Sequence, residues 1–287
     1  MSQFSYLSNK IKEADFYSEP FKHVLIEDFL SEEHFSSVLS DTQIHFEEIG
    51  STEELVRRLH TEGYRIQNFP GCTSDIDEYL WHYKNDSFPS GRKGTPIESY
   101  GITYRLHRHD TPLTRELVEY LNGAEFKATL EEKFEITKEN RIITAVQKNL
   151  SHYEISPHPD IREKVLTYLL NINKDSSVDT LPIHTHLLKF KPEWEFIKEH
   201  WSSDFSSNTT WVPWDWCDSV VRTNKNNSIV IFKPSVDTLH AVKMKYDHTK
   251  FQRTQLYGNL MSFENITNPG NYKDLIKLKN RYENSEK

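Results

Sequence analysis

The chain has 287 residues, a formal net charge of −8 and a pI near 6.0. This acidic balance disfavours a nucleic-acid partner, because nucleic-acid-binding domains usually concentrate Lys and Arg on one face. No apolar run approaches the roughly 18 residues of a membrane span, and the first residues lack the apolar core of a signal peptide, so we expect no membrane partner and a cytoplasmic location. The two cysteines, Cys72 and Cys217, predict neither a disulfide framework nor a Cys-based metal site.

The predicted elements begin with a strand over 21–27, followed by Ser31 as the N-cap of a helix. Helical spacing and length predict helices over 31–41, 52–60, 76–83, 112–121 and 128–134. The later part of the chain predicts strands over 141–148, 165–172, 184–190, 219–222, 228–232, 238–243 and 253–263. Short strands separated by Asn, Pro, Ser and Asp favour an antiparallel sandwich or barrel, and so an α+β fold class.

This order of elements predicts one domain, 1–287, made of three parts. A helix-rich support region, 1–140, precedes a strand-rich core, 141–263, and 264–287 forms a C-terminal helix or tail. One domain is reasonable at this length, because barrels and sandwiches of roughly 200–250 residues often form a single domain.

A candidate metal site begins at the triplet His158-Pro159-Asp160, which precedes the apolar phrase VLTYLLNIN. Such a triplet is expected about once by chance in a chain of this composition, so its surroundings decide its meaning. On an extended segment His158 and Asp160 point to the same face and can share one metal. His240, in the phrase DTLHAV, supplies a second imidazole. Two imidazoles and one carboxylate that leave open positions are typical of non-heme iron(II) oxygenases.

A cation near the metal would complete a site for a 2-oxoacid. Arg253 opens the strand phrase RTQLYGNLM, and a guanidinium binds a carboxylate in bidentate fashion. With a period of two, Arg253 shares a face with Gln255, Tyr257 and Asn259, and we expect this face to point inward. Lys250, in the polar turn YDHTKFQ, is the rival cation.

The second half of the chain, about 141–263, resembles the iron(II)- and 2-oxoglutarate-dependent dioxygenases, and among them the prolyl-4-hydroxylase-like branch. The phrases that carry this resemblance are HPD at 158–160, VLTYLLNIN at 165–173, NNSIVIF at 226–232, TLHAV at 238–242 and RTQLYGNL at 253–260. The phrase FKHVLIEDFLSEEHF also resembles the entry strand and helix of that branch. The strand before the triplet lacks the branch's usual Tyr-x-x-Gly phrase, which leaves Lys148, Asn149 and Tyr153 as loose candidates for pocket contacts.

The resemblance implies a double-stranded β-helix of the jelly-roll or cupin kind, flanked by N-terminal helices. The iron ligands that it implies are His158, Asp160 and His240. The residues that it implies for the cosubstrate are Arg253, at the distal carboxylate of 2-oxoglutarate, with Asn171 and Tyr257 beside it. The implied cofactor is Fe(II), with 2-oxoglutarate and O2 as cosubstrates and succinate and CO2 as products. Related halogenases replace the metal-binding carboxylate by a small residue, so Asp160 favours hydroxylation.

Other histidine pairs compete for a metal role. The pairs of His-x-carboxylate form are His45/Glu47, His60/Glu62 and His152/Glu154, and the His-x-His pairs are His107/His109 and His184/His186. The His-x-His pairs are compatible with zinc or with a metal-only cupin, although a polar loop and a sheet face explain them as well. His184 or His186 could also touch substrate, because the corresponding strand of the family lines the pocket.

The segment 191–218 is a Trp-rich insertion, with five of the six tryptophans of the chain. Aromatic clusters more often build a core than recognise a ligand. An insertion at the open end of a barrel is nevertheless where a substrate lid is expected, and we hypothesise that WVPWDWCD, with Trp214, packs over the site.

We therefore expect a hydroxylase that acts on an unactivated C–H bond of a small soluble substrate, such as an amino acid or another metabolite. A prolyl or peptidyl hydroxylase that acts on a protein is an alternative. A metal-binding cupin-type isomerase or hydrolase, which would not need Arg253, and a non-catalytic binding protein are further alternatives. The sequence does not indicate an oligomeric state.

Overall fold

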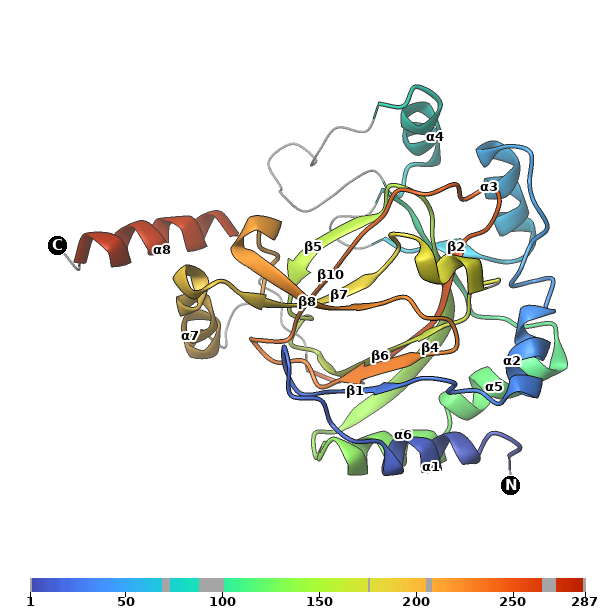
Figure 1. Cartoon of the computed structure of the whole chain (residues 1–287), viewed down its shortest axis with the longest axis horizontal. Helices are drawn as coiled ribbons and strands as arrows, with labels where there is room; N and C mark the ends of the chain where they lie inside the picture. The colour runs from blue at the N-terminus through green and yellow to red at the C-terminus, as the bar shows by residue number, and fades with distance from the viewer. Residues whose placement is uncertain are drawn as a thin grey trace.

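The computed structural model describes residues 2–68, 73–87, 101–174, 176–204, 208–264 and 272–285. Two antiparallel sheets lie face to face, and helices from the first half of the chain cover the outer side of the larger sheet (Figure 1). Cys72 lies outside the described residues, and Cys217 is a buried free thiol. Among the described residues, no helix combines the length and the apolar character of a membrane span.

The strands of the described residues form one sheet of seven strands and one of four. The larger sheet has the order β1-β9-β6-β11-β4-β3-β2, and the smaller sheet has the order β5-β10-β7-β8. The strand bounds are β1 His23–Ile26, β2 Arg65–Ile66, β3 Thr103–Leu106, β4 Asn140–Asn149, β5 Glu154–His158, β6 Lys164–Asn171, β7 Thr185–Phe190, β8 Cys217–Thr223, β9 Ile229–Phe232, β10 Leu239–Lys243 and β11 Arg253–Ser262.

The helices of the first half pack against the larger sheet, and two later helices lie beside the smaller one (Figure 1). Their bounds are α1 Tyr6–Glu13, α2 Glu32–Leu39, α3 Thr52–Thr61, α4 Ile76–Lys84, α5 Pro112–Leu121, α6 Ala124–Lys133, α7 Phe196–Ser203 and α8 Tyr272–Ser285. Short 3-10 helices occur at η1 Ser176–Thr180, η2 Pro192–Trp194 and η3 Trp214–Trp216.

The alternation of side chains along β6 separates the helical core from the interior between the sheets. Leu166, Tyr168 and Leu170 are fully buried in the core that the helices form with the larger sheet. The residues between them, Thr167 and Leu169, point to the other face, as the period of two requires. Leu169 packs there with side chains of both sheets, which include Leu187 and Val221 of the smaller sheet and Val230 and Phe232 of the larger one.

Most of the predicted elements are present, with shifted ends. Ser31 caps α2 as predicted, and its hydroxyl accepts a hydrogen bond from the backbone N–H of His34. The helix predicted over 128–134 begins earlier, at Ala124, because Gly123 takes the N-cap position. Three described elements up to the triplet were not predicted, namely α1, β2 and β3.

The Trp-rich insertion forms a helix and contributes to a small core that it shares with β7, β10 and α8. Trp201 and Trp216 are buried with Leu275 of α8. Trp194 stacks on Trp216 with ring centroids 3.6 Å apart, and Lys279 of α8 lies 3.8 Å above the Trp194 ring. The expectation that aromatic clusters build cores therefore holds for these three tryptophans.

Candidate active site

The structure brings His158, Asp160 and His240 together between the two sheets. His158 ends β5 and lies directly opposite His240 of β10 in the antiparallel register, and Asp160 follows two residues after His158. One ligand atom from each side chain lies within 4.8 Å of the others, and all three residues are buried. In the described part of the chain, this is the only such group of three His, Cys, Asp or Glu side chains.

Both imidazoles are held in the tautomer that a metal requires. Nδ1 of His158 lies 2.8 Å from the carbonyl oxygen of Ser156, and Nδ1 of His240 lies 3.2 Å from that of Thr238. Because a carbonyl only accepts, each Nδ1 must carry the proton, and each Nε2 keeps a free lone pair. Burial, together with His240, lowers the pKa of His158 to about 3, and burial also lowers the pKa of His240. Both rings are therefore neutral at pH 7 and able to bind a cation.

Asp160 is ionised and held by three groups, two of which, Lys164 and Thr209, were not expected from the sequence. Its Oδ1 accepts a hydrogen bond from Nζ of Lys164, its Oδ2 accepts one from the hydroxyl of Thr167, and its backbone carbonyl accepts one from Thr209 at 3.0 Å. Burial alone would raise the pKa of Asp160, but Lys164 and the two imidazoles hold it well below its ordinary value. Only the folded chain brings these groups to the carboxylate. Thr167 lies opposite Asn259, which belongs to the face of β11 that was predicted to point inward.

Arg253 is a buried cation with neutral partners. Its Nε donates to the carbonyl of Ile183 at 2.9 Å, and its two terminal nitrogens donate to Asn149 Oδ1 and Thr185 Oγ1, each at 2.8 Å. No carboxylate is among its partners in the described residues, and only 2% of the residue is exposed. Burial lowers the pKa of Arg253 to about 10, so the guanidinium is still charged at neutral pH.

The position of Arg253 relative to the triad follows from the strand register. Thr185, which Arg253 contacts, lies opposite Val242, two residues along β10 from His240. Two residues of a strand span roughly 7 Å. The guanidinium thus lies in the same interior as the triad, at a separation that a five-carbon dicarboxylate can bridge.

The rival cation does not reach this interior. The side chain of Lys250 is 64% exposed, and its Nζ lies 3.6 Å from the Asp247 carboxylate on the surface. Lys148 is buried but points to the helical side of β4, where its Nζ donates to Thr254 Oγ1 at 2.8 Å. Of the loose candidates, Asn149 does contact the interior site, through Arg253.

Asn171 and Tyr257 both belong to the interior face, but each already has protein partners. The Oδ1 of Asn171 accepts a hydrogen bond from Gln255 at 2.8 Å, and its amide nitrogen donates to the carbonyl of Lys225 at 3.1 Å. The hydroxyl of Tyr257 accepts a hydrogen bond from Lys164 at 2.8 Å. Gln255 Oε1 is buried without a partner among the described atoms, which leaves one acceptor for a bound molecule at this face.

The competing histidine pairs do not join the triad. Glu154 accepts a hydrogen bond from the indole of Trp214 at 2.8 Å and pairs with Lys243, so it is not a metal ligand with His152. His186 lies in β7 with its Nδ1 2.8 Å from the Ser219 hydroxyl. None of the other pairs belongs to a three-residue ligand group within the described residues.

Trp211, rather than Trp214, lies against the triad. The Trp211 ring centroid is 5.9 Å from that of His158, and its Nε1 is buried without a partner among the described atoms. Trp214 instead packs on His186, with ring centroids 5.4 Å apart. The lid hypothesis named Trp214, whereas the tryptophan beside His158 is the first one of the phrase WVPWDWCD.

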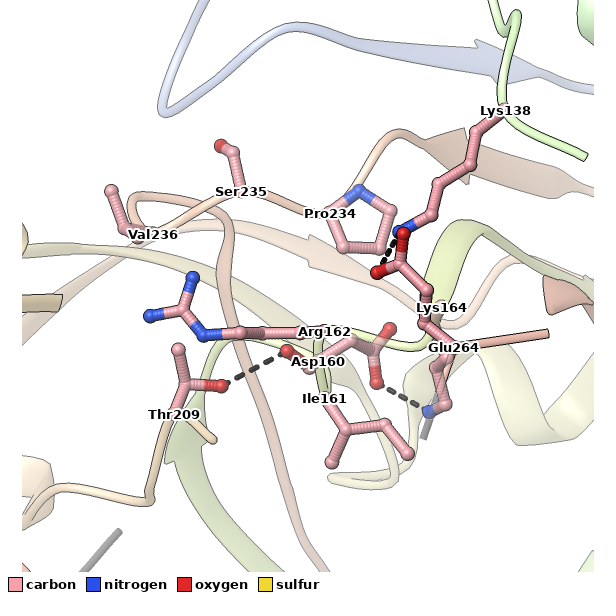
Figure 2. A pocket seen from close by; sticks show the side chains of 10 residues that line it. All are labelled: Lys138, Asp160, Ile161, Arg162, Lys164, Thr209, Pro234, Ser235, Val236 and Glu264. Carbon is pink, nitrogen blue, oxygen red and sulfur yellow. Dashed lines mark hydrogen bonds and ion pairs between the residues drawn. The ribbon is translucent and has the colours of Figure 1, made fainter. Parts of the chain in front are cut away.

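A surface pocket of about 300 Å³ is lined by Asp160 and by the segment 234–236 that joins β9 to β10 (Figure 2). Its charged side chains are already engaged. Lys138 pairs with Glu264, Lys164 pairs with Asp160, and Arg162 donates to the backbone carbonyl of Asp204 at 2.9 Å. These three cations of the pocket wall are therefore already engaged by protein groups.

Solved structures with a distant likeness to this one include a prolyl-4-hydroxylase, a carbocyclase and an epimerase. A prolyl-4-hydroxylase from Pseudomonas putida is 8% identical, with a TM-score of 0.47 over 91% of this chain and 100% of that one. The alpha ketoglutarate dependent carbocyclase SnoK is 13% identical, with a TM-score of 0.45 over 94% and 88%. The epimerase SnoN, in complex with Fe3+, alpha ketoglutarate and nogalamycin RO, is 10% identical, with a TM-score of 0.43 over 90% and 83%.

No protein-family model matches the sequence, and no curated protein matches it either. At these identities and TM-scores, the structural likeness assigns neither residues nor an activity to this chain.

Proposed function

We propose that this protein is an Fe(II)- and 2-oxoglutarate-dependent oxygenase of the prolyl-4-hydroxylase-like kind, built on a double-stranded β-helix. The observation that carries the proposal is the pairing of two unsatisfied groups in one interior. A buried triad of two histidines and one aspartate has two free imidazole lone pairs, and a buried arginine nearby has no acid partner among the described residues. A dicarboxylate that binds a metal at one end satisfies both.

The donor set fits iron(II). Two neutral imidazoles and one carboxylate with open positions are the set that non-heme iron(II) oxygenases use. The backbone carbonyls of Ser156 and Thr238 orient the two rings, and Thr167 orients the carboxylate. Bound there, the iron would supply the oxidative decarboxylation of 2-oxoglutarate to succinate and CO2, coupled to the oxidation of a substrate C–H bond.

The chain's own residues would hold the cosubstrate and exclude water. Arg253 would bind the distal carboxylate of 2-oxoglutarate through the donors that its three protein partners leave free. Asn149 and Thr185 fix the plane of the guanidinium from two sides. Gln255, Asn171 and Tyr257 would line the space beside the cosubstrate, and Trp211 would cover the His158 side of the metal.

Asp160 favours hydroxylation over halogenation, since the position keeps its carboxylate. The substrate that we propose is a small molecule. A metal-only cupin activity supplies no anion for Arg253. The buried guanidinium would then lower the stability of the fold considerably.

The test is turnover of 2-oxoglutarate without added substrate. Purified protein with Fe(II), ascorbate and oxygen should release succinate from 2-oxoglutarate slowly, and His158→Ala and Asp160→Ala should reduce the release to the level of free iron. Equal release by the wild type and both variants would overturn the proposal.

A further inference from the structure

A second arginine, Arg105, faces the same interior as the triad. It lies in β3, directly opposite Gln147 of β4, and its guanidinium carbon lies 4.7 Å from the centre of the Tyr257 ring. Tyr257 in turn accepts a hydrogen bond from Lys164, which pairs with the metal-binding carboxylate of Asp160. Arg105 therefore belongs to the wall of the proposed active site, although its position in the sequence gave no sign of this.

The guanidinium of Arg105 is fixed in place by two neutral contacts. Its Nε donates to Gln147 Oε1 at 2.9 Å, and its Cζ lies over the Tyr257 ring. Gln147 is buried and lies 3.5 Å from Asn149 Oδ1, which accepts the hydrogen bond from Arg253. A row of amides thus joins and orients the two arginines.

Both terminal nitrogens of Arg105 are left without a protein partner among the described residues. Arg105 and Tyr257 are only partly buried, which leaves the guanidinium accessible to a ligand. Two parallel N–H donors on a fixed guanidinium match the two oxygens of a carboxylate. The other cations near the triad differ, since Lys164 is engaged by Asp160 and Lys138 by Glu264.

Arg105 and Arg253 extend toward different parts of the interior, which favours separate anions for the two side chains. Arg253 lies opposite Asn149, and Arg105 lies opposite Gln147 on the other side of β4. Two strand spacings and two residues separate their Cα atoms by roughly 12 Å. Their side chains also diverge, because Arg253 reaches across to Thr185 of the smaller sheet while Arg105 lies over Tyr257.

We propose that Arg105 binds a carboxylate of the substrate itself, so that the substrate is a small carboxylic acid rather than a neutral molecule or a peptide segment. This inference rests on the proposed function, because it assigns the second anion to the substrate of the same cavity. Bidentate capture by Arg105 would fix one end of the acid near the Tyr257 ring, while Arg253, which contacts Thr185, would bind 2-oxoglutarate.

Isothermal titration calorimetry tests this inference. A panel of small molecules is titrated into the wild type and into the variants Arg105→Gln, Arg105→Lys and Arg115→Gln. The panel contains the L-amino acids and C4–C8 carboxylic acids, the carboxamide of each, and sugar phosphates, offered to metal-free protein and to protein with Fe(II) and 2-oxoglutarate under nitrogen. At least one acid should bind the wild type, and its carboxamide should bind at least 10-fold more weakly.

The variants separate local recognition from overall charge. Arg105→Gln should weaken binding of that acid by about 10- to 100-fold, as expected for the loss of charge-assisted hydrogen bonds, and Arg105→Lys should restore part of it. Arg115→Gln, at an exposed residue of α5, removes the same charge and should bind as the wild type does.

Three results would overturn the inference: no acid that binds better than its carboxamide, equal binding by the wild type and Arg105→Gln, or binding of the phosphates alone. Acid binding that depends on Arg105 in a protein that binds no iron would overturn the proposed function and leave the Arg105 site standing.

Discussion

Arg253 is the residue on which the proposed cosubstrate site depends. A buried charge is costly unless it is paired, and the three described partners of this side chain are all neutral. A bound ligand that carries a carboxylate would supply the missing anionic partner of Arg253. Asn149 and Thr185 then act as supports that hold the guanidinium ready, which lowers the cost of ordering it on binding.

Arg253→Gln is therefore expected to weaken binding of 2-oxoglutarate by about 100-fold or more, roughly 3 kcal/mol, because it removes one partner of a buried charge pair. Calorimetric titration of 2-oxoglutarate into the Fe(II) protein under nitrogen would measure this. Lys250→Gln is the matched control and should bind as the wild type does. A large loss in Lys250→Gln, with none in Arg253→Gln, would exchange their roles.

The triad and Arg253 could be proposed from the sequence, because the spacing of His158 and Asp160 is local and the order of His240 and Arg253 matches the family that the chain resembles. The sequence was not sufficient for Lys164, Trp211 or Arg105, since their approach to the site depends on strand pairing and on the path of an insertion. Arg105 in particular precedes the triplet by some fifty residues and belongs to a strand, β3, that was not predicted.

At the scale of elements, β11 is the strand that joins the site to the core. One face carries Arg253 and Tyr257, and the other packs against the helices. Gly258 belongs to the second face, where the Tyr168 ring occupies the space that a side chain would fill, with Cζ only 2.0 Å from an ideal Cβ. The Tyr168 hydroxyl is also hydrogen-bonded to Thr144 of β4, so the ring cannot move aside freely.

Gly258→Ala should consequently destabilise the fold by about 3 kcal/mol, since it overpacks a site whose neighbour is fully buried. Urea denaturation followed by circular dichroism would measure the change in the free energy of unfolding. Gly50→Ala, whose new methyl group would meet only the far end of the Glu54 side chain, should stay within about 0.5 kcal/mol of the wild type. Similar stabilities for the two variants would contradict this packing.

The alternation of β6 and β11 was readable from the sequence, because a period of two is a local property. The start of α6 and the existence of α1 were not, since packing decides them. Most residues of α1 are polar, so its sequence gives a weak helical signal. Its apolar residues Leu7 and Ile11 are nevertheless fully buried in the helical core.

At the scale of the whole molecule, the helical layer is joined to the larger sheet around a buried lysine. Nζ of Lys148 lies 5.2 Å from the centre of the Phe46 ring and 5.8 Å from that of Tyr64, both of which belong to the helical side. No carboxylate pairs with it among the described residues, and burial lowers the pKa of Lys148 from 10.5 to about 7.

This pKa makes the stability of the whole fold depend on pH. Between pH 7 and 10.5 the unfolded chain holds the Lys148 proton more tightly than the folded one, so the contribution of Lys148 to the free energy of unfolding rises with pH, by up to about 1.4 kcal/mol per pH unit. Lys148→Met removes this contribution. The variant should gain about 2–3 kcal/mol relative to the wild type on going from pH 9 to pH 7, by urea denaturation at each pH. Parallel stability curves would show that the lysine is not buried as described.

In the proposed site, the triad binds iron while Arg253 binds the far end of the same 2-oxoglutarate molecule. Visible absorption under nitrogen tests this arrangement most directly, because the chelate of 2-oxoglutarate on Fe(II) has a weak charge-transfer band and no substrate is needed. We predict a band for the wild type, no band for His158→Ala, and a band for Arg253→Gln only at much higher 2-oxoglutarate concentration. A wild-type protein that shows no band at saturating Fe(II) and 2-oxoglutarate would contradict the account.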